Sequence, residues 1–512
     1  MKRRWLRRLF LRRVLVALMI LLQICSIVYI VSVDTFYAKA FAAALRVASV
    51  FVVLYIVSRK TKPAYRLMWI ILILALPVLG CLAYLLFNFQ ASTRYYRHKL
   101  AMLEQATAPL MACGSSSLPA ALAACPEAAR DLTYLQNCAH FPVSCHTATS
   151  YYSPGEAFLP AFLADLERAE RYIFLEYFIL QEGRLWDQVL AVLRRKAAAG
   201  VLVRVMYDDM GCFFTLPGSY ARQLREWGIE AAVFNPFSPV ITAIQNNRDH
   251  RKIASIDGRV AYTGGINLAD EYINAIQKHG YWKDAALRLE GDAAWSLTVI
   301  FLQLWQLASH TAEPDIAALC PWRDTPCTQA QDGFVLPYAD SPMDAENVGE
   351  HVYIQIINQA RHTLYINTPY LIVDDNLVSA LSLAAKSGVD VRIVTPARWD
   401  KRLVHMTTRS YYRQLVEAGV KVYEYSQGFM HAKTFVADGK VATVGTTNLD
   451  FRSLYLHFEC GVWMYGSSAV RQVEQDFLAT LPDCHRVTLE ECRCGAALRL
   501  VQEVLRLFAP LM

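Results

Sequence analysis

The sequence predicts an α/β fold made of two duplicated domains, each a mixed sheet flanked by helices, behind an N-terminal α-helical membrane anchor. Three observations support this prediction. The first 90 residues hold long apolar stretches with few charges, strand-like and helix-like runs alternate from residue 151 onward, and the order of these runs repeats with a period near 185 residues. At 512 residues the chain is also too long for one ordinary domain.

The N-terminal segment has the composition of a membrane anchor. Its first thirteen residues carry seven Lys or Arg and no acid, and residues 14–33 follow with twenty uncharged positions, enough to span a bilayer. Further apolar stretches occupy residues 41–57 and 67–87. We therefore expect two or three transmembrane helices within residues 1–90. A cleaved signal peptide is the alternative, although its apolar core is usually shorter.

The duplication is visible as matched segments of the same type in the same order. A strand-like run, a helix-like run and a buried-strand run occupy residues 172–180, 185–200 and 201–208, and return at 363–372, 376–388 and 389–396. A stretch rich in Pro, Asp and Thr separates the copies and is typical of a linker. The predicted organisation is anchor 1–90, connector 91–150, first domain 151–309, linker 310–345 and second domain 346–512.

One motif occurs in both copies, as "HRKIASIDG" from residue 250 and "HAKTFVADG" from residue 431. Alternate residues of a strand share a face, so the His and Lys project together, and the following Asp-Gly is typical of a two-residue hairpin turn. A Gly and an Asn follow each hairpin. The polar motif residues are His250, Lys252, Asp257 and Asn267 in the first copy, and His431, Lys433, Asp438 and Asn448 in the second.

These residue types indicate a phosphate site. A Lys on a buried strand face is costly unless it meets an anion, an Asn side chain donates hydrogen bonds, and a His can act as nucleophile or proton carrier. Two such sets across a pseudo-twofold axis would let one His attack phosphorus while the other protonates the leaving oxygen. Lys is rarely a metal ligand and no Cys cluster has zinc spacing, so we expect no metal and no other cofactor. Asp257 and Asp438 have a second interpretation as turn residues.

The doubled motif resembles the signature of the phospholipase D superfamily, and the chain as a whole is similar to bacterial cardiolipin synthases. The similarity includes the basic N-terminus, the apolar hairpin after it, "GTTNLDFRSLYLHFE" at 445–459 and "TPYLIVDD" at 368–375. The resemblance implies two phospholipase D-like domains. It also implies reversible phosphatidyl transfer between two phosphatidylglycerol molecules, giving cardiolipin and glycerol through a phosphohistidine, without metal or nucleotide.

The resemblance further implies a role for each matching residue. His250 corresponds to the nucleophile, and His431 to the general acid and base. Glu459 corresponds to a carboxylate that orients the second His; the equivalent position of the first copy is Lys278, so Asp284 is the substitute that we expect there. We therefore predict as catalytic residues His250, Lys252, Asp257, His431, Lys433 and Asp438, and as substrate-binding residues Asn267, Asn448, Glu459 and Asp284.

Two other functions remain open at this point. A hydrolytic phospholipase D, or a phosphatidyltransferase with a different donor or acceptor, would carry the same motif. A membrane-anchored phosphodiesterase or nuclease would also carry it, but the catalytic part has no basic stripe, which counts against nucleic acid as a partner. The expected partners are phosphatidylglycerol in the bilayer and the membrane itself, with no nucleotide.

The charge distribution predicts a multi-pass protein of the cell membrane with its N-terminus in the cytoplasm. If all three apolar stretches span, the catalytic domains lie on the outer face, which we favour; an even number of spans would return them to the cytoplasm. On the outer face disulfides persist. The close cysteines there are the pairs Cys113/Cys125, Cys138/Cys145 and Cys320/Cys327 and the cluster Cys484, Cys492 and Cys494.

Overall fold

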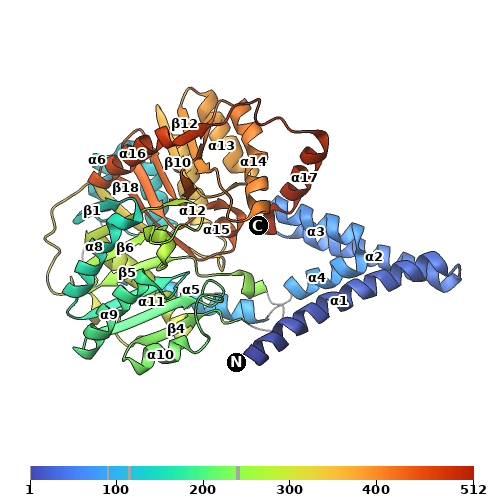
Figure 1. The fold of residues 1–512 in the computed structure, drawn as a ribbon, viewed down its shortest axis with the longest axis horizontal. Helices are drawn as coiled ribbons and strands as arrows, with labels where there is room; N and C mark the ends of the chain where they lie inside the picture. Colours follow the sequence, from blue (N-terminus) through green and yellow to red (C-terminus); the bar gives the residue numbers. More distant parts are fainter. Residues whose placement is uncertain (1, 89–90, 113–116, 238–242, 512) are drawn as a thin grey trace. The chain divides into compact units, whose positions relative to one another are not determined.

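The computed structural model describes residues 2–88, 91–112, 117–237 and 243–511, and the chain forms two compact units whose ribbon is drawn in Figure 1. The smaller unit, which we call the anchor unit, combines residues 1–95 with 237–246 and 503–512. The larger unit, which we call the catalytic unit, combines residues 96–236 and 247–502. The last ten residues therefore group with the anchor, and not with the second domain as predicted.

The anchor unit contains two helices that are long and apolar enough to cross a bilayer. These segments are Val14–Ser32, within α1 (Lys2–Ser32), and α2 (Phe36–Ser58). Much of their apolar surface is exposed; Val31 is 78% and Phe51 67% exposed. Apolar surface of this extent is unfavourable in water, and helices of this length fit the hydrocarbon core of a bilayer.

The third predicted span is wrong. Residues 67–87 do not form one helix but belong to α3 (Pro63–Ala75) and α4 (Pro77–Asn88). Pro77 breaks the helix because proline has no N–H and clashes with the preceding turn. Helices of 13 and 12 residues extend only about 20 Å, less than the roughly 30 Å of a bilayer core.

The two short helices instead fold against each other. A side chain at Gly80 would come within 2.7 Å of the Ile73 Cα, so glycine permits this close approach. The first turn of α4 is capped from α1, where Gln23 Oε1 accepts hydrogen bonds from the N–H groups of Val78 and Leu79 at 3.0 and 3.1 Å.

The catalytic unit contains two sheets of matching topology. The first has the strand order β1 (Thr147–Tyr152), β8 (Ala286–Gly291), β6 (Val260–Gly264), β5 (Lys252–Ile256), β2 (Tyr172–Tyr177), β3 (Leu202–Asp208) and β4 (Glu230–Phe234). The second has the order β9 (Phe334–Asp340), β18 (Glu459–Tyr465), β16 (Val441–Gly445), β15 (Thr434–Ala437), β10 (Thr363–Asn367), β12 (Asp390–Pro396), β13 (Lys421–Tyr425) and β19 (Cys484–Arg486). Strand for strand, β19 aside, the two halves correspond, which confirms the duplication.

Each sheet is parallel on one side and antiparallel on the other. β2, β3 and β4 are parallel, as are β10, β12 and β13, while the motif strands β5 and β15 pair antiparallel with β2 and β10. Helical connections produce the parallel part, and hairpins produce the rest. The helices that follow β2 and β10 are α9 (Arg184–Ala198) and α13 (Asp375–Lys386), both close to their predicted bounds.

The remaining helices of the two halves occupy matching places. In the first half they are α8 (Gly155–Arg168), α10 (Tyr220–Glu226) and α11 (Asp292–Ser309), and in the second α12 (Val348–Gln359), α14 (Arg402–Glu417) and α16 (Ser468–Thr480). α11 is buried along almost its whole length, because its side chains from Ala293 to Leu307 are all enclosed. Such a helix, enclosed on every side, forms part of the core.

Both halves begin earlier than the sequence pattern suggested. β1 starts inside the predicted connector, and β9 lies inside the predicted linker. They are equivalent strands, paired antiparallel with β8 and β18. β9 contains Pro337, ends at Asp340 and is followed by Ser and Pro, a composition that resembles a linker more than a strand.

The close cysteine pairs, for which disulfides were left open, do not form them in the described part of the chain. Cys125, Cys138, Cys145 and Cys327 are free thiols, so none of the three proposed pairs forms. Cys320 is in a disulfide, and Cys113 lies outside the described residues. The close spacing of these cysteines along the chain does not bring their side chains together.

Asp257 and Asp438 are turn residues and not part of the catalytic cluster, which corrects their predicted role. Both have positive φ, 54° and 53°, and each precedes a Gly with φ of 65° and 62°, as a type I′ hairpin requires. Each follows its motif His by seven residues, which is about 23 Å along an extended chain. The Asp257 carboxylate accepts three backbone N–H bonds of 2.7–2.8 Å, from Glu170, Arg171 and Tyr172.

Substitution of Asp257 should therefore reduce stability without changing the chemistry. Asp438 makes the same three bonds of 2.7–2.8 Å, to residues 361–363, so the two sites can be compared. We expect Asp257→Ala to lower the free energy of unfolding by about 1–3 kcal/mol, through the lost acceptor and the strain of positive φ. Asp257→Asn, which tolerates this φ, should cost less. Urea denaturation measures both; loss of turnover in a variant of unchanged stability would return Asp257 to the active site.

Candidate active site

The two motif histidines are held by backbone bonds that cross between the halves. His431 follows β14 (Gly428–Met430), which pairs parallel with β7 (Tyr281–Lys283) of the first half. The His431 N–H donates to the Lys283 carbonyl at 2.7 Å, and the His250 N–H donates to the Phe458 carbonyl at 2.9 Å. Each catalytic half thus fixes the backbone of the other half's histidine.

Each histidine also pairs with a carboxylate of the opposite half. His250 Nδ1 lies 2.9 and 3.0 Å from the two oxygens of Glu459, and His431 Nδ1 lies 2.6 Å from Asp284 Oδ2. This corrects the predicted pairing, in which Glu459 oriented the second His. The sequence motif suggested partners within one half, whereas the crossing of the backbone segments exchanges them.

Asp284 replaces Glu459 in the first half because the loop before it is longer. Glu459 follows His431 by 28 residues and Asp284 follows His250 by 34. Lys278, at the shorter spacing, is largely exposed and pairs with Glu271 at 3.4 Å. Asp284 thus occupies the position equivalent to Glu459, and the His that it contacts is the second.

The one variable position of the motif, Gly265 in the first copy and Thr446 in the second, has a structural reason. Thr446 Oγ1 donates a hydrogen bond of 2.5 Å to Glu459 Oε2. At Gly265 a Cβ would come within 2.0 Å of Asp284 Oδ1. The shorter Asp side chain thus occupies space that only a glycine leaves free.

The two motif lysines are buried beside the histidines. Lys252 is 1% and Lys433 2% exposed. Lys252 Nζ donates to the His250 carbonyl at 2.6 Å, and Lys433 Nζ donates to the His431 carbonyl. Burial lowers the pKa of Lys252 to about 8 and that of Lys433 to about 7, against the attraction of the two carboxylates. An ammonium has three N–H groups, so each lysine retains donors for an anion.

The two asparagines are buried next to the motif strands. Asn267 Oδ1 accepts from the Ile179 N–H at 3.0 Å, and its Nδ2 donates to the Tyr272 hydroxyl at 2.7 Å. Asn448 Nδ2 donates to Asp450 at 3.2 Å, and its Oδ1 has no partner among the described residues. Each amide therefore keeps one N–H free to donate.

The electrostatics of the site favour neutral imidazoles and ionised carboxylates. Burial lowers the pKa of His250 to about 3 and that of His431 to about 4, although their carboxylate partners oppose this. Burial alone would raise the pKa of Glu459 and Asp284, but the histidines hold both below their ordinary values. With Nδ1–H donating to a carboxylate, each imidazole has its Nε2 lone pair free.

A third histidine, His457, lies in the same cluster and was missed from the sequence. Its side chain is 11% exposed, and Nδ1 is 3.8 Å from Glu459 Oε1. Its ring centroid is 5.7 Å from that of His250. The only signal in the sequence is its place two residues before Glu459. Donor atoms of His250, His457 and Glu459 lie within 4.8 Å of one another, so of the described residues these three could approach a metal ion.

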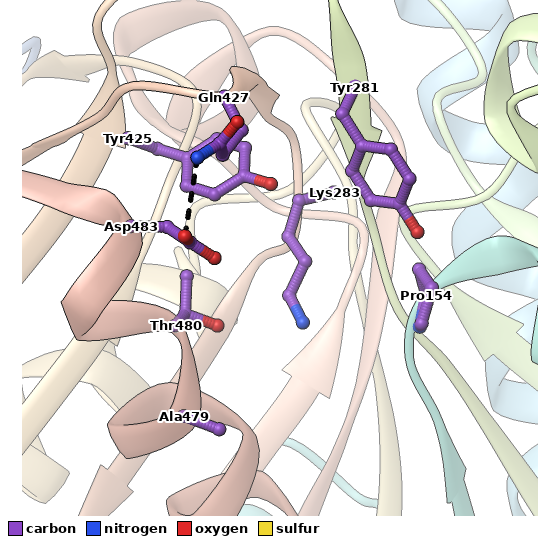
Figure 2. A pocket seen from close by; sticks show the side chains of 8 residues that line it. All are labelled: Pro154, Tyr281, Lys283, Tyr425, Gln427, Ala479, Thr480 and Asp483. Atoms are coloured by element: carbon purple, nitrogen blue, oxygen red, sulfur yellow. Dashed lines mark hydrogen bonds between the residues drawn. The ribbon is translucent and has the colours of Figure 1, made fainter.

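A cavity of about 380 Å³ has none of the motif histidines or lysines among its lining residues (Figure 2). β7 lines it with Tyr281 and Lys283, and residues of the second half, including Tyr425 and Asp483, complete the wall. Alternate residues of a strand face opposite sides, which is why Asp284 reaches His431 instead of the cavity. The Lys283 ammonium is paired with Asp476 at 2.5 Å.

Comparison with known proteins identifies the family. Residues 162–294 and 353–481 match the family model described as "Cardiolipin synthase, PLD-like domain", and residues 47–87 match "Phospholipase_D-nuclease N-terminal". The first two segments cover both halves of the duplication, including both histidine motifs.

Similar proteins extend over nearly the whole chain. A cardiolipin synthase of Geobacillus kaustophilus is 33% identical over 478 residues, 92% of this chain and 94% of that protein. Cardiolipin synthase 2 of Bacillus anthracis is 34% identical over 457 residues, 88% of this chain and 87% of that protein. An uncharacterized protein of Streptococcus mutans is 40% identical over 462 residues, 90% of this chain and 99% of that protein.

Among solved structures, a phosphatidylserine synthase of Haemophilus influenzae has the same fold. It covers 74% of this chain and 98% of its own length, with a TM-score of 0.56 and 14% identity. The fold, the duplicated motif and the relatives lead to one conclusion. The chain belongs to the cardiolipin synthase family of phospholipase D-like proteins, and it is a phosphatidyltransferase.

Proposed function

We propose that this protein transfers a phosphatidyl group between two phosphatidylglycerol molecules, giving cardiolipin and glycerol through a phosphohistidine at His250. One observation carries the proposal. Two imidazoles, each fixed at Nδ1 by a carboxylate of the opposite half, leave two Nε2 atoms free beside two buried lysines. That arrangement supplies a nucleophile, a proton carrier and an anion site in one cluster.

In the first step His250 Nε2 attacks phosphorus of the donor lipid. The new P–N bond forms as the bond from phosphorus to the glycerol oxygen breaks, and His431 donates a proton to that oxygen. Lys252 and Lys433 stabilise the negative charge on the non-bridging oxygens. Glu459 stabilises the positive charge that develops on the His250 ring, because its carboxylate accepts a hydrogen bond from Nδ1–H, with 2.9 Å between Nδ1 and Oε1.

In the second step the same groups act in reverse. The hydroxyl of a second phosphatidylglycerol gives its proton to His431, and its oxygen attacks phosphorus as the P–N bond breaks. A phosphodiester is consumed and a phosphodiester is formed, so the reaction needs no nucleotide. Asp284 holds His431 through Nδ1 at 2.6 Å and so keeps Nε2 available for the proton in both steps.

The charge of the site supports these roles. Two lysines and two carboxylates bring the cluster close to neutrality, and both histidines have pKa values lowered to about 3 and 4 by burial. A bound phosphodiester adds one negative charge, which favours the protonated form of an imidazole. The proton that His431 donates is therefore taken up with the substrate.

The proposal is tested by the lipid products of the purified protein. Incubation with phosphatidylglycerol in detergent micelles, without nucleotide, should give cardiolipin and glycerol in equal amounts, resolved by mass spectrometry. Phosphatidic acid with glycerol would show a hydrolase. No product from phosphatidylglycerol, but turnover of another phospholipid, would show a different donor.

For the membrane we propose two spans, with the catalytic unit on the cytoplasmic side. The basic N-terminus favours the cytoplasm, and the segments Val14–Ser32 and Phe36–Ser58 return the chain to the same side. Arg59, Lys60, Lys62 and Arg66 follow the second span, which agrees with the positive-inside rule. The outer-face expectation depended on a third span at residues 67–87.

Cysteine labelling in intact cells tests this topology. In a background without native cysteines, Asp34→Cys, in the exposed turn between α1 and α2, should react with a membrane-impermeant maleimide. Lys60→Cys and Thr325→Cys, both at exposed positions, should react only after lysis. Labelling of Thr325→Cys in intact cells would place the catalytic unit outside, and protection of Asp34→Cys would contradict the first span.

A further inference from the structure

His457 occupies the place that Trp282 occupies in the other half of the site. The carbonyl of Phe458 accepts from the His250 N–H, and that of Lys283 accepts from the His431 N–H. The residues just before these, His457 and Trp282, are therefore equivalent. Their rings lie beside the catalytic histidines in similar orientations. The ring centroids of His457 and His250 are 5.7 Å apart with an interplanar angle of 46°, and those of Trp282 and His431 are 5.0 Å apart with an angle of 44°.

The two equivalent residues differ in their polar atoms. Trp282 has one N–H, and this group donates to Asp284 Oδ2 at 3.4 Å. His457 has two ring nitrogens, both buried and both without a hydrogen-bond partner in the described part of the chain. Glu459 Oε1 is 3.8 Å from His457 Nδ1, beyond hydrogen-bond distance.

A buried imidazole without partners needs an explanation. One of its nitrogens must carry a proton, and a buried donor without an acceptor destabilises the fold. Glu459 is already engaged, because it accepts from His250 at 2.9 and 3.0 Å and from Thr446 at 2.5 Å. An acceptor that arrives with the substrate would satisfy His457.

We propose that His457 is a third substrate-binding histidine, which donates a hydrogen bond to a non-bridging oxygen of the phosphodiester on the His250 side of the site. This inference rests on the proposed function, since it adds a phosphate contact to the same reaction. A ring nitrogen of His457 lies within 4.8 Å of a ring nitrogen of His250. Phosphorus bonded to His250 would bring its oxygens into the space between the two rings.

The contact makes the two half-sites different. Trp282 has no donor to spare, so the His431 side has no equivalent bond. An anionic phosphate held by His457 as well as by the lysines is drawn toward His250, the side from which the nucleophile attacks. The two halves have the same fold, but the difference between His457 and Trp282 places the phosphate closer to His250 than to His431.

The test compares variants that retain or remove the donor. His457→Gln keeps a side-chain N–H, whereas His457→Phe keeps a ring of similar shape without one. We expect His457→Phe to raise the KM for dioctanoyl-phosphatidylglycerol, or lower kcat/KM, by roughly tenfold to a hundredfold. His457→Gln should recover most of that loss. His485→Ala, which removes an exposed histidine on β19, is the control and should match the parent protein.

Binding of inorganic phosphate, measured by isothermal titration calorimetry, separates this proposal from the proposed function. The dissociation constant should rise about tenfold in His457→Phe and little in His457→Gln. If the parent protein binds phosphate in this way but makes no cardiolipin, the function is wrong and the phosphate contact stands. If it makes cardiolipin while His457→Phe retains its KM, kcat and phosphate affinity, the role of His457 is overturned. Equal losses in Phe and Gln variants with a lower melting temperature would also overturn it, because they would show a packing role.

Discussion

His431→Ala protein should accumulate a covalent phosphatidyl adduct on His250, and His250→Ala protein should form none. Both variants should lose lipid turnover by at least about 10⁴-fold, because each imidazole acts in both half-reactions. The two are distinguished with an activated donor, such as phosphatidyl-p-nitrophenol, whose leaving group needs no protonation. With this donor His431→Ala can still form the P–N bond, but it has no base to activate the acceptor.

The adduct is detected by mass spectrometry of peptides prepared at alkaline pH, where phosphohistidine is stable. His485→Ala is the control for general effects of removing a histidine. An adduct on His431 in the His250→Ala protein, and none in the other variant, would reverse the roles. Turnover that persists in either variant would exclude a mechanism that depends on two histidines.

With the activated donor, whose leaving group needs no protonation, the two carboxylates should affect different half-reactions. Because Glu459 contacts His250 and Asp284 contacts His431, Glu459→Gln should slow adduct formation from the activated donor, whereas Asp284→Asn should slow only its release. We expect a loss of roughly 10²–10⁴-fold in overall turnover for each, the range seen when a partner that orients a catalytic group is removed.

This experiment also decides between two pairings. If the pairing is exchanged between the halves, as in the structure, Glu459→Gln should impair adduct formation as His250→Ala does. Asp284→Asn should impair adduct release as His431→Ala does. Pairing within each half, as the sequence motif suggested, would give the reverse. Burst kinetics of p-nitrophenol release measure adduct formation directly, so the two outcomes do not depend on the slower lipid assay.

The sequence predicted the elements of the site better than their connections. The strand patterns around His250 and His431 and the Asp-Gly turns depend on local spacing, so they could be predicted from short segments. The carboxylate partners of these histidines lie far from them in the sequence; Glu459 is 209 residues after His250. No local pattern shows that Glu459 crosses to His250, so the predicted pairing was wrong.

Other errors have similar physical causes. Lys278 marks the expected spacing of a carboxylate, but a longer loop moves the functional position to Asp284. His457 was missed because a His beside an acidic residue is common in surface loops, and only burial makes it notable. The third span was predicted because a proline is tolerable in a membrane helix, whereas here Pro77 starts a new helix.

The stereochemical course at phosphorus tests the central claim most directly. Each in-line displacement inverts the configuration, so two successive displacements through a phosphohistidine retain it. A phosphorothioate analogue of phosphatidylglycerol, of one configuration at phosphorus, would be converted by the purified protein and the product configuration determined by ³¹P NMR. Our account predicts retention; inversion would show direct transfer between the two lipids and contradict the covalent intermediate.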